Sequence, residues 1–201
     1  MEKSSVIWNN EVDQADKTAR ALIETKRAEF RWKTPFYPPL LLAYIRFRKH
    51  LFLTRRNLLF TKQLAFESAK EISRGKDRAV ERSSIEIKTK KILGKDGKGF
   101  YSEKIRLKQL HEIELLIDHY LQLLNSDGTS YEEMIKTAYK SKREYLSFLN
   151  KLQRTEQEVI QAAVVTMQKG STQDRLKWFK KVQRVSRKAR MDKMESIFSE
   201  G

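Results

Sequence analysis

The side chains best suited to acid–base chemistry lie close together on one predicted helix. His111, Glu114 and Asp118 are spaced by three and four residues, so they share a helix face. His119 follows Asp118 directly. Leu115 occupies the position of the second histidine of a zinc-binding His-Glu-x-x-His motif, and the order of the groups reverses the Glu-x-x-His order of di-iron bundles. The face lies to the side of the helix's apolar stripe, so we expect these groups to be in water.

A glycine-rich segment over 94–99 is the other candidate for chemistry, because such loops can cradle phosphates. Gly99 is followed by Phe100 rather than by the Lys and Ser or Thr of a P-loop, so we interpret the segment as a turn. The chain has no cysteine, which removes thiolate metal ligands, and no nucleophile-elbow serine. We therefore expect a protein that is not an enzyme and that uses no metal or cofactor.

Positive charge is concentrated in two segments of the chain. The net charge is +16. Residues 30–66 contain eight Lys or Arg and no acid, and residues 169–193 contain ten Lys or Arg against two acids. Each segment therefore contributes +8, and the remainder is balanced. Charge gathered in this way indicates a surface that binds an anionic partner.

The second basic segment has the pattern of an amphipathic helix. Apolar residues recur at spacings of four, three and four on one face, from Trp178 to Ala189, and cations surround them. Nucleic acid phosphates, an acidic membrane surface or an acidic groove of another protein would suit this pattern, and the alternative is an apolar face packed on the bundle. The residues predicted to bind the partner are Arg175, Lys177, Trp178, Lys180, Lys181, Arg184, Arg187, Lys188 and Arg190.

The first basic segment has apolar side chains on three sides of its predicted helix, which indicates contacts on several sides. It could be the central helix of a bundle, an insertion or self-association surface over 36–66, or a helix lying on an anionic membrane. Buried cations need partners, and no acid lies within the segment, so their pairing must be non-local. The residues added to the predicted partner-binding set are Arg46, Arg48, Lys49, Arg55 and Arg56.

The elements that must carry these residues are all predicted to be helices. All three prolines fall within 35–39, the glycines fall near helix ends, and no sustained alternation of β-branched residues occurs. The predicted helices cover about 11–31, 39–73, 77–93, 102–125, 131–169 and 173–199. We expect an all-α fold, an elongated bundle over 1–169 with long antiparallel, coiled-coil-like helices, followed by a basic amphipathic C-terminal helix over 173–199.

Apolar residues at heptad spacing indicate the core of this bundle. The stripe in the predicted helix 131–169 has two polar interruptions, Lys142 and Glu156. We assign both stripes to packing rather than to a cofactor. The stripe residues are Leu110, Ile113, Ile117, Tyr120 and Leu124 in 102–125, and Ile135, Ala138, Lys142, Tyr145, Leu149, Leu152, Glu156, Val159 and Ala163 in 131–169.

Neither an apolar leader nor an 18-residue apolar run occurs in the sequence, which predicts a cytoplasmic protein. No zinc-finger, aromatic-sheet or helix-turn-helix motif for reading bases is present, so nucleic acid would be bound through its shape and charge. The predicted function is a non-enzymatic basic helical adaptor that docks on a polyanion, foremost nucleic acid or a ribonucleoprotein. The alternative is a structural or assembly subunit of a larger protein machine, with or without membrane association.

Overall fold

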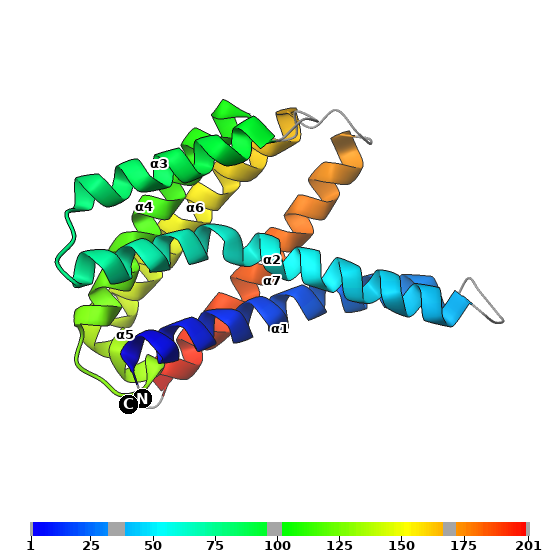
Figure 1. Ribbon diagram of the computed structural model, residues 1–201. Coiled ribbons are helices and arrows are strands. Elements are labelled where there is room, and N and C mark those ends of the chain that lie inside the picture. Colours follow the sequence, from blue (N-terminus) through cyan, green and yellow to red (C-terminus); the bar gives the residue numbers. More distant parts are fainter. Residues whose placement is uncertain (1, 32–38, 96–101, 167–171, 200–201) are drawn as a thin grey trace.

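Seven α-helices make up the part of the chain that the computed structural model describes, and no strand occurs there (Figure 1). Residues 1, 32–38, 96–101, 167–171 and 200–201 lie outside it, as do the side chains of 23–31, 39–50, 53, 164–166, 172, 174 and 175. The all-α prediction is confirmed. The helices are α1 (Lys3–Arg31), α2 (Pro39–Ser73), α3 (Arg78–Lys95), α4 (Glu103–Asn125), α5 (Tyr131–Tyr139), α6 (Lys142–Thr166) and α7 (Thr172–Ser199).

The central helix of the bundle is α4, which packs against α2, α6, α3, α5 and α1. Two of its neighbours, α3 and α6, run antiparallel to it. Lys108 near the start of α4 pairs with Glu158 in the last third of α6, and Arg78 at the start of α3 pairs with Asp118. The central position considered for the 39–73 helix is thus occupied by α4. Three of its five predicted stripe residues, Ile113, Ile117 and Tyr120, are buried, and Leu110 and Leu124 are half-buried. Coiled-coil packing of α4 and α6 stays a prediction.

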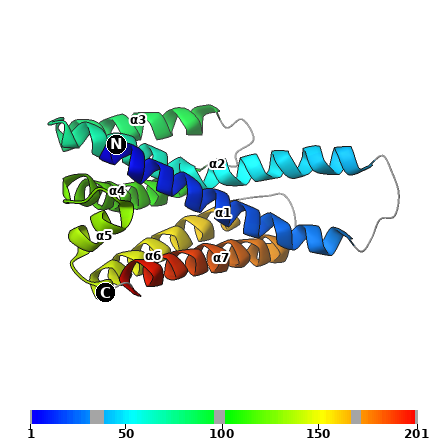
Figure 2. The ribbon, with the colours of Figure 1, turned by 90° about the horizontal axis from the view of Figure 1, so that it is seen from below.

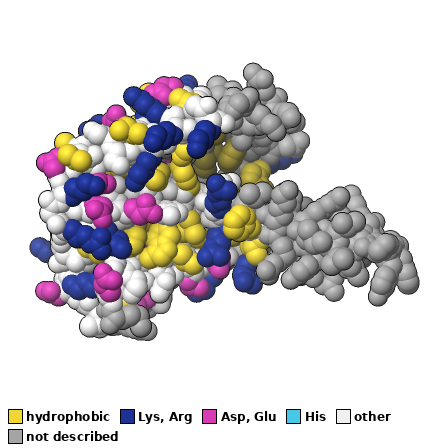
Figure 3. All heavy atoms as spheres, in the orientation of Figure 1, with side chains coloured by type: hydrophobic (Ala, Val, Ile, Leu, Met, Phe, Trp, Pro, Cys, Tyr) yellow, Lys and Arg dark blue, Asp and Glu magenta, His cyan; other side chains and the backbone are white. Residues whose placement is uncertain are grey.

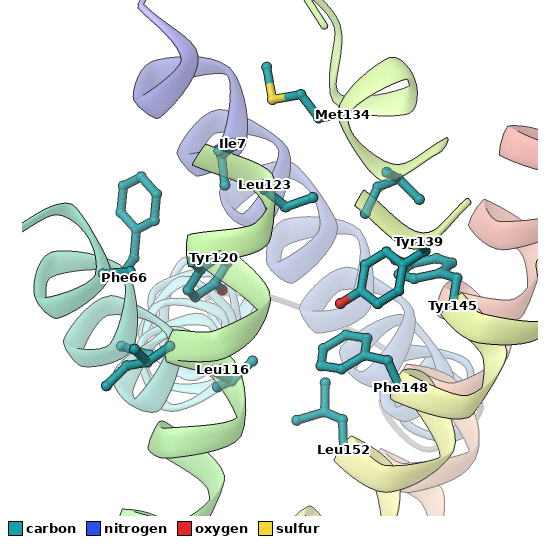
Figure 4. Close-up of a cluster of buried hydrophobic side chains, with 14 of the residues drawn as sticks. Ile7, Phe66, Leu116, Tyr120, Leu123, Met134, Tyr139, Tyr145, Phe148 and Leu152 are labelled. Carbon is teal, nitrogen blue, oxygen red and sulfur yellow. The ribbon is translucent and has the colours of Figure 1, made fainter. Parts of the chain in front are cut away.

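The hydrophobic core lies around α4, as predicted from its apolar stripe. Tyr120 is fully buried, with its ring edge against Phe66 of α2, and Ile7 of α1 lies in the same cluster (Figure 4). On the other side of α4, Tyr145 and Phe148 of α6 fill the space beside Tyr139 of α5. Aromatic side chains bury large apolar areas, so this cluster provides much of the driving force for folding.

The first helix begins eight residues earlier than predicted, at Lys3 instead of about residue 11. Asn10, just before the predicted start, lies inside the helix. The early start is explained by packing: Ile7 is fully buried, and Trp8 stacks on Phe66 with ring centroids 5.5 Å apart. Tertiary burial of these residues outweighs the weak helix propensity of the Asn pair.

The helix predicted over 131–169 is broken into α5 and α6. Lys140 adopts a left-handed conformation with φ of 53°, and its N–H donates to the carbonyl of Lys136 at 3.0 Å. The next helix begins at once, because Ser141 Oγ accepts a hydrogen bond from the N–H of Glu144 at 3.2 Å. The break turns α5 away from α6, and it is located between Ala138 and Lys142 of the predicted stripe.

Two helices, α1 and α2, run side by side and extend past the other helices toward the 32–38 segment (Figures 1 and 2). The view from below shows α7 lying along α6, with α1 crossing close to both α2 and α7. Across the described residues, no helix is long and apolar enough to cross a lipid bilayer.

Candidate anion-docking site

The two parts of α7 differ in how they attach to the bundle. Between residues 176 and 189 every described side chain is exposed or half-buried. Met194 and Ile197 near the other end are buried in the core. Lys193 pairs with Glu132 of α5, and the carboxylate Glu195 accepts from Lys142 Nζ at 2.6 Å. The helix is therefore anchored by its last ten residues, and its earlier part presents cations at the surface.

A groove of about 430 Å³ lies between α6 and this earlier part of α7. Four of its seven lining side chains are cations, and none is an acid. Lys180, Arg184 and Arg187 are spaced by four and three residues along α7, so they form a row about 10 Å long on one face. The lining residues are Gln153, Lys180, Gln183, Arg184, Arg187, Lys188 and Met191; we call this the α6/α7 groove.

The remaining predicted residues of α7 flank the groove. Lys177 is exposed, and the Lys181 ammonium lies 6.0 Å from the ring centroid of half-buried Trp178, a cation–π contact. The predicted site residue Arg175 has its side chain outside the described residues. No carboxylate partner is found in the described part of the chain for Lys177, Lys181 or the four groove cations.

Arg190 lies three residues beyond Arg187 on α7, and its side chain is directed inward to α6. Its guanidinium donates two hydrogen bonds to Glu156 of α6, one of them 2.8 Å long, and its side chain is 12% exposed. Such a two-point contact fixes both side chains. The charge of Arg190 is thus used within the fold, and we do not include this residue in the docking surface.

The predicted residues of α2 are not brought next to those of α7. Within the described residues the backbones of α2 and α7 do not come close to each other, and α1 packs against both. Arg55 pairs with Asp16 of α1 at 3.0 Å, whereas Arg56 is exposed. The non-local pairing expected for this acid-free segment is confirmed for Arg55 and, more deeply in the bundle, for Lys62. The side chains of the other three predicted residues, Arg46, Arg48 and Lys49, lie outside the described residues.

Beneath the groove, five helices each contribute charged side chains to one buried cluster. Lys62 donates to Glu11 at 2.5 Å, and Thr61 Oγ1 donates to Glu112 at 2.6 Å. The members are Glu11 from α1, Lys62 from α2, Glu112 and His119 from α4, Glu156 from α6 and Arg190 from α7; we call this the ion junction. A cavity of about 20 Å³, close to the volume of one water, adjoins four of them, Glu11, Lys62, His119 and Arg190.

The carboxyl of Glu112 is the unbalanced acid of this junction. Glu11 and Glu156 each have a cationic partner, and the close contact of Glu112 is the neutral hydroxyl of Thr61. Burial, and then the nearby charge of Glu156, raise the pKa of Glu112 from 4.5 to about 7. Burial alone would raise the pKa of Glu11 as well, but Lys62 brings it below its usual value.

His119 is also part of this cluster, which differs from the exposed position expected for it. Its Nδ1 lies 2.6 Å from the hydroxyl of Tyr139, and burial lowers its pKa from 6.5 to about 4. His111 is exposed, and Glu114 and Asp118 pair with Arg82 and Arg78 of α3 at the surface, as expected. No group of His and carboxylates in the described residues could hold a metal ion.

One signal of the ion junction is visible in the sequence. Glu156 interrupts an apolar heptad stripe, and a charged residue at such a position is either exposed or paired inside the bundle. Its partner Arg190 was predicted as a surface cation because it follows a run of exposed ones. Glu11 and Glu112 carry no such signal, because each lies among other polar residues on its helix.

The described residues form an all-α bundle with a cationic groove on its surface. No known protein family matches the chain, and comparison with the curated proteins and with the solved structures finds no significant match.

Proposed function

We propose that this protein is a non-enzymatic adaptor that docks on a polyanion through the α6/α7 groove, with nucleic acid or a ribonucleoprotein as the foremost partner. The observation that carries this proposal is the groove lining, with four cations and no acid. Some cations elsewhere on the bundle, among them Arg78 and Arg82 of α3, are instead paired with neighbouring carboxylates. An unneutralised row of cations gains most when it displaces counterions from phosphates.

The side chains of the groove favour contact with a phosphate backbone over reading of bases. Arg184 and Arg187 offer guanidinium forks that suit phosphate oxygens, and Gln153 and Gln183 can add neutral hydrogen bonds. Trp178 on the same helix is half-buried, and its ring is in contact with Lys181. We therefore expect binding that depends on salt and is indifferent to sequence.

Fluorescence anisotropy with a labelled nucleic acid duplex of about 20 base pairs, measured from about 50 to 200 mM salt, tests the proposal. Replacement of Lys180, Arg184, Arg187 and Lys188 by Gln should weaken binding and make the slope of log Kd against log salt shallower by about 3 to 4, at 0.9 per lost contact. Circular dichroism should show unchanged helicity. Absence of wild-type binding at the lowest salt would refute the proposal.

A matched control variant separates the groove from net charge. Lys88, Lys90, Lys91 and Lys95 are four exposed cations of α3, away from the groove, and their replacement by Gln removes the same charge. This variant should change the salt slope by less than about 1. Equal slopes for the two variants would show that overall charge, rather than the groove, binds the nucleic acid.

A second candidate function, an assembly subunit, is favoured by the surface of α2. Phe52 is 61% exposed, and Leu58, Leu59 and Phe60 are half-buried. Figure 3 shows an apolar patch on the face along which α2 runs in Figure 1. Exposed apolar patches mark protein contacts. Light scattering tests this function: a monodisperse monomer whose Phe52→Ser variant has unchanged solubility and mass would argue against it.

A further inference from the structure

The α6/α7 groove and the ion junction are one helical turn apart on both helices that form the groove. On α7, Arg187 lines the groove, and Arg190, three residues on, enters the junction. On α6, Gln153 lines the groove, and Glu156, three residues on, accepts from Arg190. Residues three apart on a helix are neighbours, so the Arg190–Glu156 pair separates a solvent-filled cationic groove from a buried set of charges.

The charges of the ion junction balance only when one carboxyl is neutral. Three acids, Glu11, Glu112 and Glu156, lie with two cations, Lys62 and Arg190. His119 is held neutral by its burial. Because Glu112 has no cation of its own in direct contact, the missing charge is supplied at lowest cost by a proton on its carboxyl. With that proton the junction is neutral, and without it the junction carries one buried negative charge.

The helices packed around Glu112 place titratable or polar side chains near it or elsewhere in the ion junction. The hydroxyls of Tyr131 and Tyr139 on α5 are uncharged, and α3 directs Arg78 and Arg82 to Asp118 and Glu114 on another face of α4. The groups on the Glu112 side are Glu11 from α1, Thr61 and Lys62 from α2, His119 and Tyr120 from α4, Glu156 from α6 and Arg190 from α7.

We propose that docking at the α6/α7 groove is proton-linked, so that an anionic partner in the groove favours the state in which the carboxyl of Glu112 carries a proton. This inference rests on the proposed function. Phosphates in the groove would repel a negative charge that is buried in the neighbouring ion junction, where the low dielectric weakens screening. Binding then draws a proton from the buffer onto a Glu112 carboxylate oxygen, and release of the partner returns it.

The direction of the linkage follows from the charge states. Burial places the pKa of Glu112 at about 7, so its carboxyl changes charge within the physiological range. Below that pH the junction is neutral and docking is strong. Above it the buried carboxylate opposes the partner, and we expect affinity to fall about three- to tenfold between pH 6 and pH 8.

The test is duplex binding by wild type and by the Glu112→Gln variant at pH 6 and pH 8, at one low salt concentration. Glutamine keeps the size of the side chain and an oxygen that can accept from Thr61, but it cannot ionise. We expect the wild type to lose affinity about three- to tenfold with rising pH, and the variant to bind equally well at both values. Wild-type affinity that is the same at the two pH values would overturn the inference.

An exposed histidine is the main competing source of such a pH effect, and His111 is exposed. The His111→Gln variant is the matched control, and it should keep the wild-type pH dependence. A pH effect that persists in Glu112→Gln and disappears in His111→Gln would overturn the proton linkage while leaving groove binding intact. Failure of the wild type to bind at either pH would instead refute the proposed function, and the linkage with it.

A second measurement, on the wild type, tests the proton linkage if the Glu112→Gln variant does not fold. Calorimetric titration of the wild type with the same duplex, in two buffers of different ionisation enthalpy at pH 7, gives the number of protons taken up on binding. We expect uptake of a fraction of one proton, unchanged in His111→Gln. Zero uptake, or release of protons, would overturn the linkage.

Discussion

His119 stacks on Phe148, with ring centroids 4.3 Å apart and ring planes 14° from parallel. The contact joins α4 to α6 at the edge of the ion junction, and it places the imidazole between an aromatic ring and the hydroxyl of Tyr139. Burial in such surroundings favours the neutral form of the imidazole over the charged form. Stability should therefore depend on pH in a way that can be traced to this one side chain.

Protonation of His119 should contribute a loss of stability on acidification. Its pKa is about 4 in the folded protein and 6.5 when exposed, so the stability associated with the neutral ring is present above pH 6.5 and is lost as pH falls toward 4. The full loss is about 3 kcal/mol. The His119→Gln variant should lack this acid-dependent loss. Urea unfolding at pH 4.5 and pH 7 measures both, and an unchanged slope in the variant would contradict the assignment.

The carboxyl of Glu112 should have the opposite effect. Its pKa is about 7 in the folded protein and 4.5 when exposed, so the folded state holds a proton that the unfolded state has lost, and stability falls as pH rises from 4.5 to 7. Glu112→Gln should be up to about 3 kcal/mol more stable than wild type at pH 8 and nearly equal to it at pH 4.5. Thermal unfolding at the two pH values would show this difference.

The effects of His119 and Glu112 on the pH dependence of stability should largely cancel in the wild type. Between about pH 4.5 and 6.5, His119 makes stability rise with pH and Glu112 makes it fall, so the wild-type curve should be nearly flat. The single variants should each expose one slope, positive in Glu112→Gln and negative in His119→Gln. Equal slopes in the wild type and in both variants would show that other groups dominate.

Loss of Arg190 should be among the most damaging single changes. Arg190→Met removes the partner of Glu156 and leaves an uncompensated half-buried carboxylate beside the other acids of the junction, which should reduce the free energy of unfolding by about 3 kcal/mol. The double variant Arg190→Met with Glu156→Met should recover a substantial part of this loss, because neither charge remains. A double-mutant cycle by urea unfolding would measure the coupling, and additive losses would show that the pair does not interact.

Two phenylalanines of α2 should respond very differently to truncation. Phe66 is 6% exposed and stacked on Trp8, so Phe66→Ala should destabilise the fold by about 3–5 kcal/mol. Phe52 is 61% exposed, so Phe52→Ala should change stability by less than about 0.5 kcal/mol. The two variants together test whether α2 lies at the side of the bundle. A large loss of stability in Phe52→Ala would instead indicate that α2 is central.

The sequence was sufficient for the helices and for much of the core, because apolar periodicity and capping signals are local. The capping box of Ser130 and Glu133 forms as its spacing predicts. The break at Lys140 was missed, although Ser141 and Glu144 repeat the Ser-x-x-Glu signal, because heptad spacing continued through it.

The candidate site was predictable only in part. The cations of 176–188 were found from their composition and from their arrangement around an apolar face. The ion junction was missed because its members come from five helices, and each looks like an ordinary surface residue on its own helix. Pairing such as that of Lys62 with Glu11 depends on how helices pack, and periodicity along one helix does not contain that information.

The contribution of α7 to the ion junction also has a consequence for the order of folding. During synthesis α7 leaves the ribosome after the other six described helices, and until then Lys62 is the only cation among the members of the junction. Three carboxylates beside one cation do not favour a closed, dry interior. The five helices should therefore come together as one unit once Arg190 has been made, rather than adding one by one to a growing nascent bundle.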